Sequence, residues 1–510
     1  MSVKLLVLGL DAACWPLVDR LAGLGWLPTI QALATRGWRA PLASTNPPIT
    51  PPAWTTIITG VQPARHGVLS FCRPDPGSGL VQPTNGLARQ VRTIFDYLGE
   101  EGVTSGAVNI PWTYPAGEWP GFCVSGFDAP SLDAAAFSSP ELAAQLRTAA
   151  PDYALHVSGA GPVEAIVGQT GHKVVAALAL ARSLPVDVLF VVLMATDVAG
   201  HVHWPDTGDE LLPDSPLVQV YRAADRALAQ LLDAVTPRNV VVLSDHGMGR
   251  CHALLNFSQP LFAAGLMRPA AGTWQRLTLP LYRGARAVFR RLRGAHAPGG
   301  DNGGGAHVNR WAPRVDWQRS AVHSGHGFGW LQLQGEAVAK DETRAREVLL
   351  AAAADRYPAP ILGVERADGV EGGPKLLVRV NYEAGYWMAP PILDPAEPFL
   401  IRDTHHPAFQ RAGHRPHGLF VAAGSDVGAG EGDQPIAIQD VAPTLIHLAG
   451  GTAPEGLDGH TDRRLLAREA LAARPPATRW TPLERERGET SYSDEQRQAV
   501  EGRLRDLGYM

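Results

Sequence analysis

The chain has little cysteine, no long unbroken apolar run and only a small excess of charge of one sign. Its four cysteines are scattered along 510 residues and form no C-x-x-C pair, so the sequence predicts reduced thiols and no disulfide framework. The longest apolar region, 174–195, is broken by Pro185 and by two charged residues, which predicts a helix and a strand and no membrane span. A formal charge of -5 gives no reason to expect a nucleic-acid polymer or a membrane surface as partner. We therefore expect a globular protein of a reducing compartment, the cytoplasm.

Alternating strands and helices indicate the fold class. Short runs of aliphatic and β-branched residues predict buried strands at 5–10, 104–110, 187–194, 240–243 and 418–424. The stretches between them predict helices at 28–36, 55–59, 91–99, 171–184, 217–235, 341–356, 438–448 and 493–507. Because strand and helix alternate along most of the chain, we expect an α/β fold with a mostly parallel central sheet flanked by helices.

The pattern changes between about residues 254 and 316. Five arginines stand among Leu, Val and Phe at 277–293, and a glycine-rich stretch follows at 299–305. The arginines fit either a solvated helix face or a basic wall for an anionic substrate, and the sequence leaves both readings open. We interpret the region as an inserted cap on one core, followed by a charged tail with a terminal helix: core 1–253 and 317–465, cap 254–316, tail 466–510.

Three of the predicted strands are followed by an aspartate, namely Asp11, Asp197 and Asp245. Parallel strands bring their carboxyl ends to one edge of the sheet, where ligands bind in α/β proteins. If the three strands are neighbours, each pair of carboxylates at ~4–5 Å costs roughly 3–4 kcal/mol at an effective dielectric constant of ~20. Without cations the carboxylates would repel one another or take up protons, and two divalent ions would balance them.

Histidines that could complete such metal sites stand close to these aspartates. His246 is adjacent to Asp245, and His201 follows Asp197 by four residues, a spacing that lets both side chains face one way on a helical turn. Asp oxygen and neutral His nitrogen are both good ligands for Zn or Mn. The two glycines that follow His246 predict a tight turn. A third imidazole, from late in the chain, would complete a second site.

Thr50 lies in a loop rich in Pro and Thr, just ahead of a helix expected to begin after Pro51 and Pro52. At a helix N-terminus the backbone N–H groups and the dipole favour an anion. A free threonine hydroxyl is a poor nucleophile at neutral pH. A metal ion can lower the pKa of a bound hydroxyl steeply, as it lowers that of bound water from ~15.7 to ~7. Thr50 is therefore a candidate metal-activated nucleophile for attack on phosphorus.

These motifs together resemble those of a known family. They occur along the chain in this order: Asp11; Thr50-Pro-Pro-Ala-Trp-Thr-Thr-Ile-Ile-Thr-Gly60; Gln62-Pro-Ala-Arg-His-Gly67; Thr196-Asp197 with His201; Ser244-Asp-His-Gly247; Gly413-His-Arg-Pro-His-Gly418; and Asp440-Val-Ala-Pro-Thr-Leu445. In this order they resemble the type I phosphodiesterase/nucleotide pyrophosphatase family of the alkaline phosphatase superfamily, from residue 1 to about 465. The resemblance implies an alkaline-phosphatase-like sandwich and hydrolysis of a phosphodiester or pyrophosphate P–O bond in a small-molecule phosphate ester.

The resemblance also implies ligand sets and roles. Two divalent ions are expected, Zn in the first place and Mn as the alternative. Thr50 would form a covalent phospho-threonine that water later hydrolyses, and Asn109 would help to hold the phosphoryl oxygen. The late histidine is expected at His414, with His417 as its close rival and His405 or His406 as further ones. One ion would be held by Asp11, Thr50, Asp245 and His246, and the other by Asp197, His201 and the late histidine.

Some features of the sequence differ from those of related families, and several alternative functions stay open. Sulfatases need a cysteine or serine followed by Pro and Arg where this chain has Thr50-Pro51-Pro52, so ordinary sulfatase chemistry is not expected. No site for a third metal is evident, which favours diesters. The alternatives are a phosphomonoesterase or phosphonate-ester hydrolase, a phosphoglycerate-mutase-like isomerase or phosphotransferase, and a binding protein that kept its metals. Trp54 and Trp112 fit either a pocket lining or core packing, and a homo-oligomer stays open.

Overall fold

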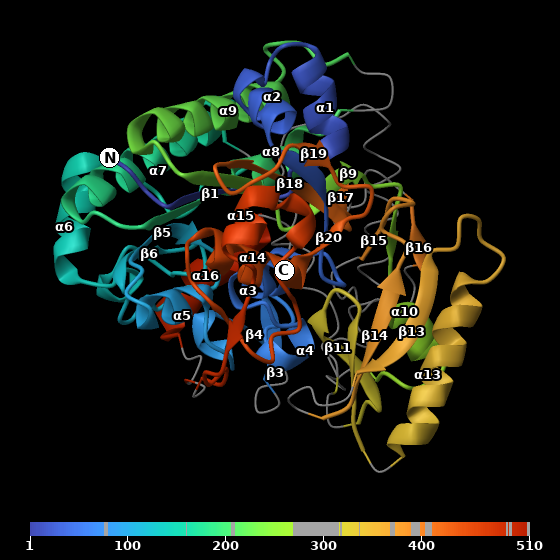
Figure 1. The fold of residues 1–510 in the computed structure, drawn as a ribbon. Helices are drawn as coiled ribbons and strands as arrows, with labels where there is room; N and C mark the ends of the chain where they lie inside the picture. The colour runs from blue at the N-terminus through green and yellow to red at the C-terminus, as the bar shows by residue number, and fades with distance from the viewer. Residues whose placement is uncertain are drawn as a thin grey trace.

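Figure 1 shows a chain of two lobes, the larger of which is built around a central β-sheet. The computed structural model describes residues 1–75, 80–159, 161–205, 210–268, 316, 319–335, 337–367, 373–388, 398–402, 411–485, 488 and 492–506. Three of the sequence-based expectations lie outside these residues: the arginine-rich helix at 277–293, the glycine-rich stretch at 299–305, and the rivals His405 and His406.

Nine strands form the sheet of the larger lobe, in the order β19-β2-β18-β8-β1-β7-β5-β6, with β20 paired to β2. Within this sheet β18 runs antiparallel to β2 and β8, and the other pairs are parallel. The mostly parallel sheet expected from the sequence is thereby confirmed. Its strands are β1 (Leu5–Leu10), β2 (Trp38–Ala43), β5 (Ser105–Ile110), β6 (Gly121–Ser125), β7 (Val188–Leu193), β8 (Asn239–Leu243), β18 (His417–Gly424), β19 (Gly430–Glu431) and β20 (Ile436–Ala437).

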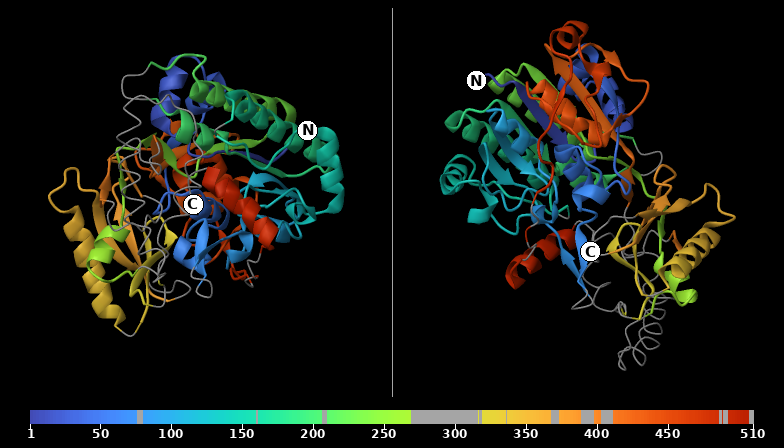
Figure 2. Two further views of the ribbon diagram at one scale, coloured as in Figure 1. Left: turned by 180° about the vertical axis from the view of Figure 1, so that it is seen from behind. Right: turned by 60° about the horizontal axis from the view of Figure 1, so that its bottom comes forward.

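Helices cover both faces of this sheet (Figures 1 and 2). Side chains alternate along β1, so that Leu6 and Leu8 pack into one apolar cluster while Leu5 and Val7 pack into the other. Burial on both faces explains why the strands read as unbroken apolar runs. The first cluster includes α1 (Trp15–Gly23), α2 (Pro28–Arg36), α7 (Val163–Ser183) and α9 (Pro216–Val235), and the second includes α3 (Thr50–Thr59), α5 (Ile94–Glu100) and α14 (Val441–Leu448).

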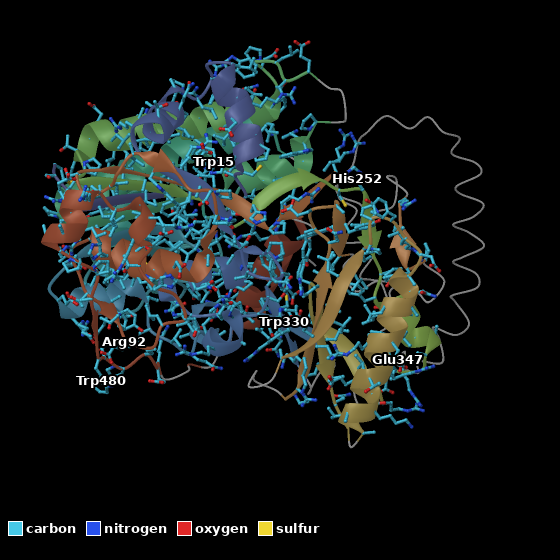
Figure 3. The ribbon with its side chains drawn as sticks, turned by 45° about the vertical axis from the view of Figure 1, so that its right-hand side comes forward. Trp15, Arg92, His252, Trp330, Glu347 and Trp480 are labelled. Atoms are coloured by element: carbon cyan, nitrogen blue, oxygen red, sulfur yellow. The ribbon has the colours of Figure 1, made fainter. Side chains whose placement is uncertain are left out.

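The smaller lobe holds the four-stranded sheet β11-β12-β14-β13 and the three-stranded sheet β15-β10-β16. Trp330 lies where the lobes meet (Figure 3) and packs with Leu69 of the larger lobe. The domain limits expected from the sequence stay a prediction, because 269–315 lies outside the described residues. The elements of the lobe are α10 (Ser258–Ala263), α13 (Val338–Ala353), β10 (Ala253–Leu255), β11 (Val322–Gly327), β12 (Trp330–Leu333), β13 (Ile361–Ala367), β14 (Lys375–Val380), β15 (Tyr386–Met388) and β16 (Leu400–Ile401).

Shorter elements complete the larger lobe, and the C-terminal segment returns to it. The ring of Tyr492 stacks on that of Tyr114, with centroids 6.1 Å apart, and Arg503 donates to the carbonyl oxygen of Ala129 at 2.7 Å. The expected terminal helix is confirmed and is docked on the core. These elements are α4 (Pro63–His66), α6 (Pro140–Ala149), α8 (Ala195–His203), α15 (Arg468–Ala473), α16 (Asp494–Asp506), β3 (Cys72–Asp75), β4 (Leu80–Pro83), β9 (Gly247–Arg250), β17 (Ala412–Arg415), β21 (Ala453–Pro454) and β22 (Thr478–Arg479).

Several expected boundaries need correction. Helix α3 begins at Thr50 and includes both prolines, because proline fits the first helical turn, where its missing N–H is not needed. Helix α13 begins at Val338, so Asp341 lies in its first turn and is not its cap. Strand β2 was not expected, since Arg39 and Pro41 interrupt the apolar pattern.

The remaining bulk expectations can be compared directly with the described residues. The four cysteines are buried and unpaired, as expected for reduced thiols. Among the described residues, no helix combines the length and the apolar character needed to cross a membrane.

Candidate metal centre

The three aspartates come together at one edge of the sheet. Strand β1 lies between β7 and β8 and pairs with both in parallel, so the ends of the three strands are level. Asp11 directly follows β1, Asp245 follows β8 by two residues, and Asp197 lies in the first turn of α8, which begins just after β7. All three side chains are buried. The expectation that these strands are neighbours is confirmed.

One group of possible ligands consists of Asp11, Asp245 and His246, whose donor atoms lie within 4.8 Å of one another. The Nε2 atom of His246 is 3.1 Å from Asp245 Oδ2 and 3.7 Å from Asp11 Oδ1. The hydroxyl oxygen of Thr50, the first residue of α3, is 3.4 Å from the same Nε2 atom. The structure therefore brings the expected nucleophile and three of its expected companions together.

A second group consists of Asp197, His246 and His414, again with donor atoms within 4.8 Å of one another. Asp197 Oδ1 is 3.2 Å from Nε2 of His414 and 3.3 Å from Nε2 of His201. The Nε2 atoms of His201 and His414 are 2.9 Å apart. His246 thus belongs to both groups, whereas the sequence-based division assigned it to one ion.

The Nδ1 atoms of two imidazoles face carbonyl oxygens. His414 Nδ1 lies 2.8 Å from the carbonyl oxygen of Pro48, and His246 Nδ1 lies 3.2 Å from that of Gly247. A carbonyl oxygen only accepts, so in a neutral ring Nδ1 carries the proton and the lone pair is on Nε2. Both Nε2 lone pairs therefore point at the carboxylates, in the arrangement that metal-binding histidines use.

Of the two candidate late histidines that the structure describes, His414 joins the cluster and His417 does not. His414 lies in β17, which pairs with β9. Strand β9 begins directly after His246, and the pairing sets His414 opposite Met248. His417 instead bonds through Nδ1 to Glu383 Oε1 at 2.7 Å, and both side chains are about half exposed. This geometry supports the choice of His414.

The glycines after His246 do not form the tight turn expected from the sequence, because Gly247–Arg250 is the strand β9. A Cβ atom at Gly247 would lie 2.2 Å from the carbonyl oxygen of His417, and one at Gly249 would lie 2.7 Å from Nε of Arg415. The missing side chains leave room for the close approach of β17 and its neighbours. These glycines therefore serve the placement of His414.

Burial and mutual repulsion set the charge of the aspartates. Burial, followed by the charges of Asp245 and Asp197, raises the pKa of Asp11 well above its usual value. Burial and the charge of Asp197 likewise raise the pKa of Asp245. Burial also acts to raise the pKa of Asp197, but His201 and His414 outweigh it and hold that pKa well below its usual value.

Two histidines of the cluster, His246 and His414, favour their neutral form. Burial, and then the neighbouring imidazole of His414, lowers the pKa of His246 well below its usual value. Burial lowers the pKa of His414 as well. The neutral imidazole is the form that binds metal ions. These two histidines are therefore better suited to be metal ligands than to form ion pairs with the carboxylates.

The donor set fits a divalent cation. Asp11 Oδ1 and Asp245 Oδ2 are buried and accept no hydrogen bond, whereas the second oxygen of each carboxylate is taken. The indole N–H of Trp54 donates to Asp11 Oδ2 at 2.8 Å, and the backbone N–H of Ala12 donates to Asp245 Oδ1 at 3.3 Å. A buried acceptor without a partner costs about 1–3 kcal/mol, and more when it is charged. A cation between the two free oxygens would remove this cost.

The hydrogen bonds of Asn109 go to residues outside this cluster. Its amide N–H donates to the carbonyl oxygen of Val192 at 2.8 Å, and its Oδ1 accepts from Lys173 at 3.1 Å. Lys173 belongs to α7, in the helix layer opposite to α3, which Thr50 begins. Asn109 thus has hydrogen-bond partners on β7 and α7, and its expected role at the phosphoryl oxygen stays a prediction.

Sequence reasoning missed the residues that support the ligands. The indole of Trp54, for which packing and lining were both left open, bonds to Asp11, and the hydroxyl of Thr196 donates to the backbone oxygen of Asp11 at 2.6 Å. Arg415 donates to the carbonyl oxygens of Gly413 and His414 at 3.3 and 3.2 Å. Of these supporting residues, only Trp54, an aromatic residue four positions after Thr50, gives a signal in the sequence. The others depend on distant parts of the chain.

Comparisons with known proteins identify a matching family. A family model described as type I phosphodiesterase/nucleotide pyrophosphatase matches residues 5–296, more than half of the 510 residues. A search of curated protein sequences found no match. The matched range contains every expected site residue except His414.

Solved structures with a similar fold include two ectonucleotide pyrophosphatase/phosphodiesterase 5 proteins. The human protein is 14% identical, with a TM-score of 0.50, over 91% of this chain and 100% of that one. The murine protein is 15% identical, with a TM-score of 0.48, over 92% of this chain and 100% of that one. At this identity the human structure shows the fold alone. The expected alkaline-phosphatase-like fold class is confirmed.

Proposed function

The chain belongs to the type I phosphodiesterase/nucleotide pyrophosphatase family, and from this premise we propose that it is a metal-dependent hydrolase that uses Thr50 as its nucleophile. Its substrate is a small-molecule phosphate ester with a phosphodiester or pyrophosphate bond. Two divalent ions act as cofactors, and Zn suits the mixed carboxylate and imidazole donors better than Mn.

One observation carries the proposal. The hydroxyl of Thr50 lies 3.4 Å from Nε2 of His246, and that imidazole belongs to both groups of possible metal ligands. Nucleophile and ligands therefore meet at one point, although Thr50 and His246 are far apart in the sequence. Thr50 also begins helix α3, whose dipole favours an anionic group at this end. Pro51 and Pro52 have no N–H to offer, so backbone donors contribute little here.

The residues divide into two sets around the proposed ions. Asp11, Asp245 and Thr50 would serve one ion, Asp197, His201 and His414 the other, and His246 is within reach of both. When bound, the ions lower the pKa of the threonine hydroxyl and neutralise the charge that develops on the oxygens of the phosphoryl group. Orphaned oxygens on Asp11 and Asp245 support this assignment.

The reaction has two halves. In the first, a bond forms between Thr50 Oγ1 and phosphorus, the bond from phosphorus to the leaving oxygen breaks, and the hydroxyl proton passes to solvent. The leaving oxygen departs with the bonding electrons and takes up a proton. In the second half, water attacks the phospho-threonine, the Thr50 Oγ1–P bond breaks, and the threonine hydroxyl and a free phosphate ester or phosphate result.

A substrate panel tests the proposal. Hydrolysis of p-nitrophenyl monoesters, diesters, phosphonates and sulfates is measured with added Zn or Mn, before and after chelation. We expect diesters to be cleaved fastest, activity to vanish on chelation, and Zn to restore it. Activity that survives complete metal removal contradicts the proposal, and so does transfer of the phosphoryl group to an acceptor without any hydrolysis. The second result identifies the phosphotransferase or mutase alternative.

A further inference from the structure

The side chain of Trp54 connects the helix of the nucleophile to a metal ligand. Trp54 stands one turn after Thr50 on α3 and is completely buried. Its indole N–H donates to Asp11 Oδ2 at 2.8 Å. The bond joins α3 to the end of β1, two elements that otherwise meet through apolar packing. Asp11 is therefore oriented by the same helix that presents Thr50.

The position of the Trp54 ring is fixed on more than one side. A Cβ atom at Gly9 would lie 2.3 Å from Cη2 of Trp54, so the ring occupies the space above β1 that the glycine leaves. Phe190 of the neighbouring strand meets the ring edge-on, with centroids 6.2 Å apart. A ring held in this way keeps its N–H on Asp11 Oδ2 without the entropy cost of ordering a mobile donor.

This hydrogen bond limits how many oxygens Asp11 can offer. Trp54 occupies Oδ2 of Asp11, and the N–H of Ala12 occupies Oδ1 of Asp245. Each carboxylate is left with one oxygen without a hydrogen bond, Asp11 Oδ1 and Asp245 Oδ2. With His246 and Thr50 the group has four donor atoms. Four donors of mixed oxygen and nitrogen suit Zn, whereas Mn is better served by a larger set of oxygen ligands.

We propose that Trp54 is a positioning residue that restricts Asp11 to one ligand oxygen and thereby makes this group select Zn over Mn. The inference rests on the proposed function, since it assumes that the group holds a metal ion. Loss of the indole N–H would free the second oxygen of Asp11. The carboxylate could then bind through both oxygens or turn away, and both changes weaken the preference for Zn.

The test compares Trp54→Phe with Trp112→Phe in the full-length protein. Trp112 is a matched control, because its indole is also buried and donates to Thr84 Oγ1 at 3.3 Å, outside both ligand groups. Dissociation constants for Zn and Mn are measured by competition with a chelator. We expect Trp54→Phe to weaken Zn binding about tenfold at one of the two sites, the size of effect seen when a partner of a ligand is removed. We expect Mn binding to change less, so that the ratio of the two constants falls, while Trp112→Phe leaves the ratio at the wild-type value.

A wild-type measurement keeps the inference testable if Trp54→Phe does not fold. The protein is loaded with Co²⁺ in place of Zn, and the intensity of its visible absorption reports the coordination number. An intense four-coordinate band from the ion held by Asp11, Asp245 and His246 supports the inference, and a weak six-coordinate band from that ion overturns it. An unchanged ratio of Zn to Mn affinity in folded Trp54→Phe also overturns it. A wild-type protein that binds no metal overturns the proposed function itself, and the inference falls with it.

Discussion

The imidazole rings of His246 and His414 are stacked, with centroids 3.7 Å apart and ring planes inclined by 18°. One ring follows β8 and the other is carried by β17, so the stack joins two parts of the chain that are distant in sequence. Burial lowers the pKa of both rings, and two neutral rings can stack without repulsion. The stack therefore positions one proposed ligand against another.

Replacement of His414 by alanine distinguishes the two late histidines. We expect His414→Ala to lose one of two bound metal ions and to lower turnover by more than about a hundredfold, because a ligand is removed directly. His417→Ala is the control, since His417 is half exposed and pairs with Glu383. It should keep both ions. Metal content by elemental analysis decides, and the assignment is wrong if the two variants behave in the opposite way.

Substitutions of Thr50 test the nucleophile. Thr50→Ala should lower turnover at least about a thousandfold, as losses of catalytic nucleophiles do, while the carboxylates and imidazoles still hold metal. Thr50→Ser keeps a hydroxyl and should retain measurable turnover with a trapped phospho-serine in acid-quenched samples. Steady-state rates and intact-protein mass spectrometry are the measurements. A Thr50→Ala variant with near wild-type turnover would exclude a covalent role for this residue.

Arg415 braces the strand that carries His414. Its guanidinium donates to carbonyl oxygens on both β17 and β9, those of Gly413, His414 and Arg250. Removing a charged donor from buried carbonyl groups should cost about 2 kcal/mol in Arg415→Met. Arg415→Lys should recover only part of the lost stability. Its ammonium group is still a charged donor, but it cannot span both strands as the planar guanidinium does.

The control for Arg415 is an exposed arginine. Arg379 pairs with Glu365 at 2.7 Å with both side chains about half exposed. Arg379→Met should change the free energy of unfolding by less than about 1 kcal/mol. Urea unfolding curves measure both variants. Equal losses in the two arginine variants would remove the special role of Arg415.

The ion pair of His417 and Glu383 should make stability depend on pH. The hydrogen bond between the two side chains raises the pKa of His417 and lowers the pKa of Glu383. The histidine's contribution is therefore complete below its usual pKa and is lost as pH rises through its raised value. The carboxylate's contribution is lost as pH falls through its lowered value. His417→Gln should cost about 0.5 kcal/mol near pH 6 and nothing near pH 9, since the pair is half exposed. A loss that is the same at both pH values would show that the charge is irrelevant.

Gly247 should not tolerate a side chain. The added Cβ would lie 2.2 Å from the carbonyl oxygen of His417, and backbone cannot move aside as a flexible side chain can. Gly247→Ala should cost about 2–3 kcal/mol, in the upper part of the usual range of about 1–3 kcal/mol for overpacking. Gly168 is the matched control, because it lies inside α7 and a Cβ there meets nothing within 4 Å. Gly168→Ala should stabilise by about 0.5–1 kcal/mol. Thermal unfolding of both variants tests the contrast.

The sequence predicted the parts of the site that depend on local pattern. The runs ending before Asp11 and Asp245 were recognised as buried strands because unbroken apolar residues are typical of parallel sheets. The four-residue spacing of Asp197 and His201 correctly indicated a helical turn. These features need only neighbouring residues to be read.

Features that depend on distant contacts were not predicted. The glycines after His246 were interpreted as turn residues, because nothing nearby in the sequence shows that β17 approaches them. The bond from Trp54 to Asp11 and the membership of His246 in both ligand groups likewise require the assembled sheet. Helix α3 begins earlier than just after Pro51 and Pro52, where the sequence predicts it, because the first helical turn accepts proline.

The place of β18 has a consequence for the order in which the protein is completed. This strand lies between β2 and β8, although it comes long after both of them in the sequence. Until residue 424 has left the ribosome, the edge of β8 that faces β18 has no partner, although β1 pairs with its other edge, and the open edge could pair with another nascent chain. His414 lies in β17, the strand before β18, so the three aspartates also lack their last candidate imidazole until then. We expect translation intermediates that end before β18 to be sensitive to protease and to aggregate, and ribosome-bound chains of defined length can be used to test this.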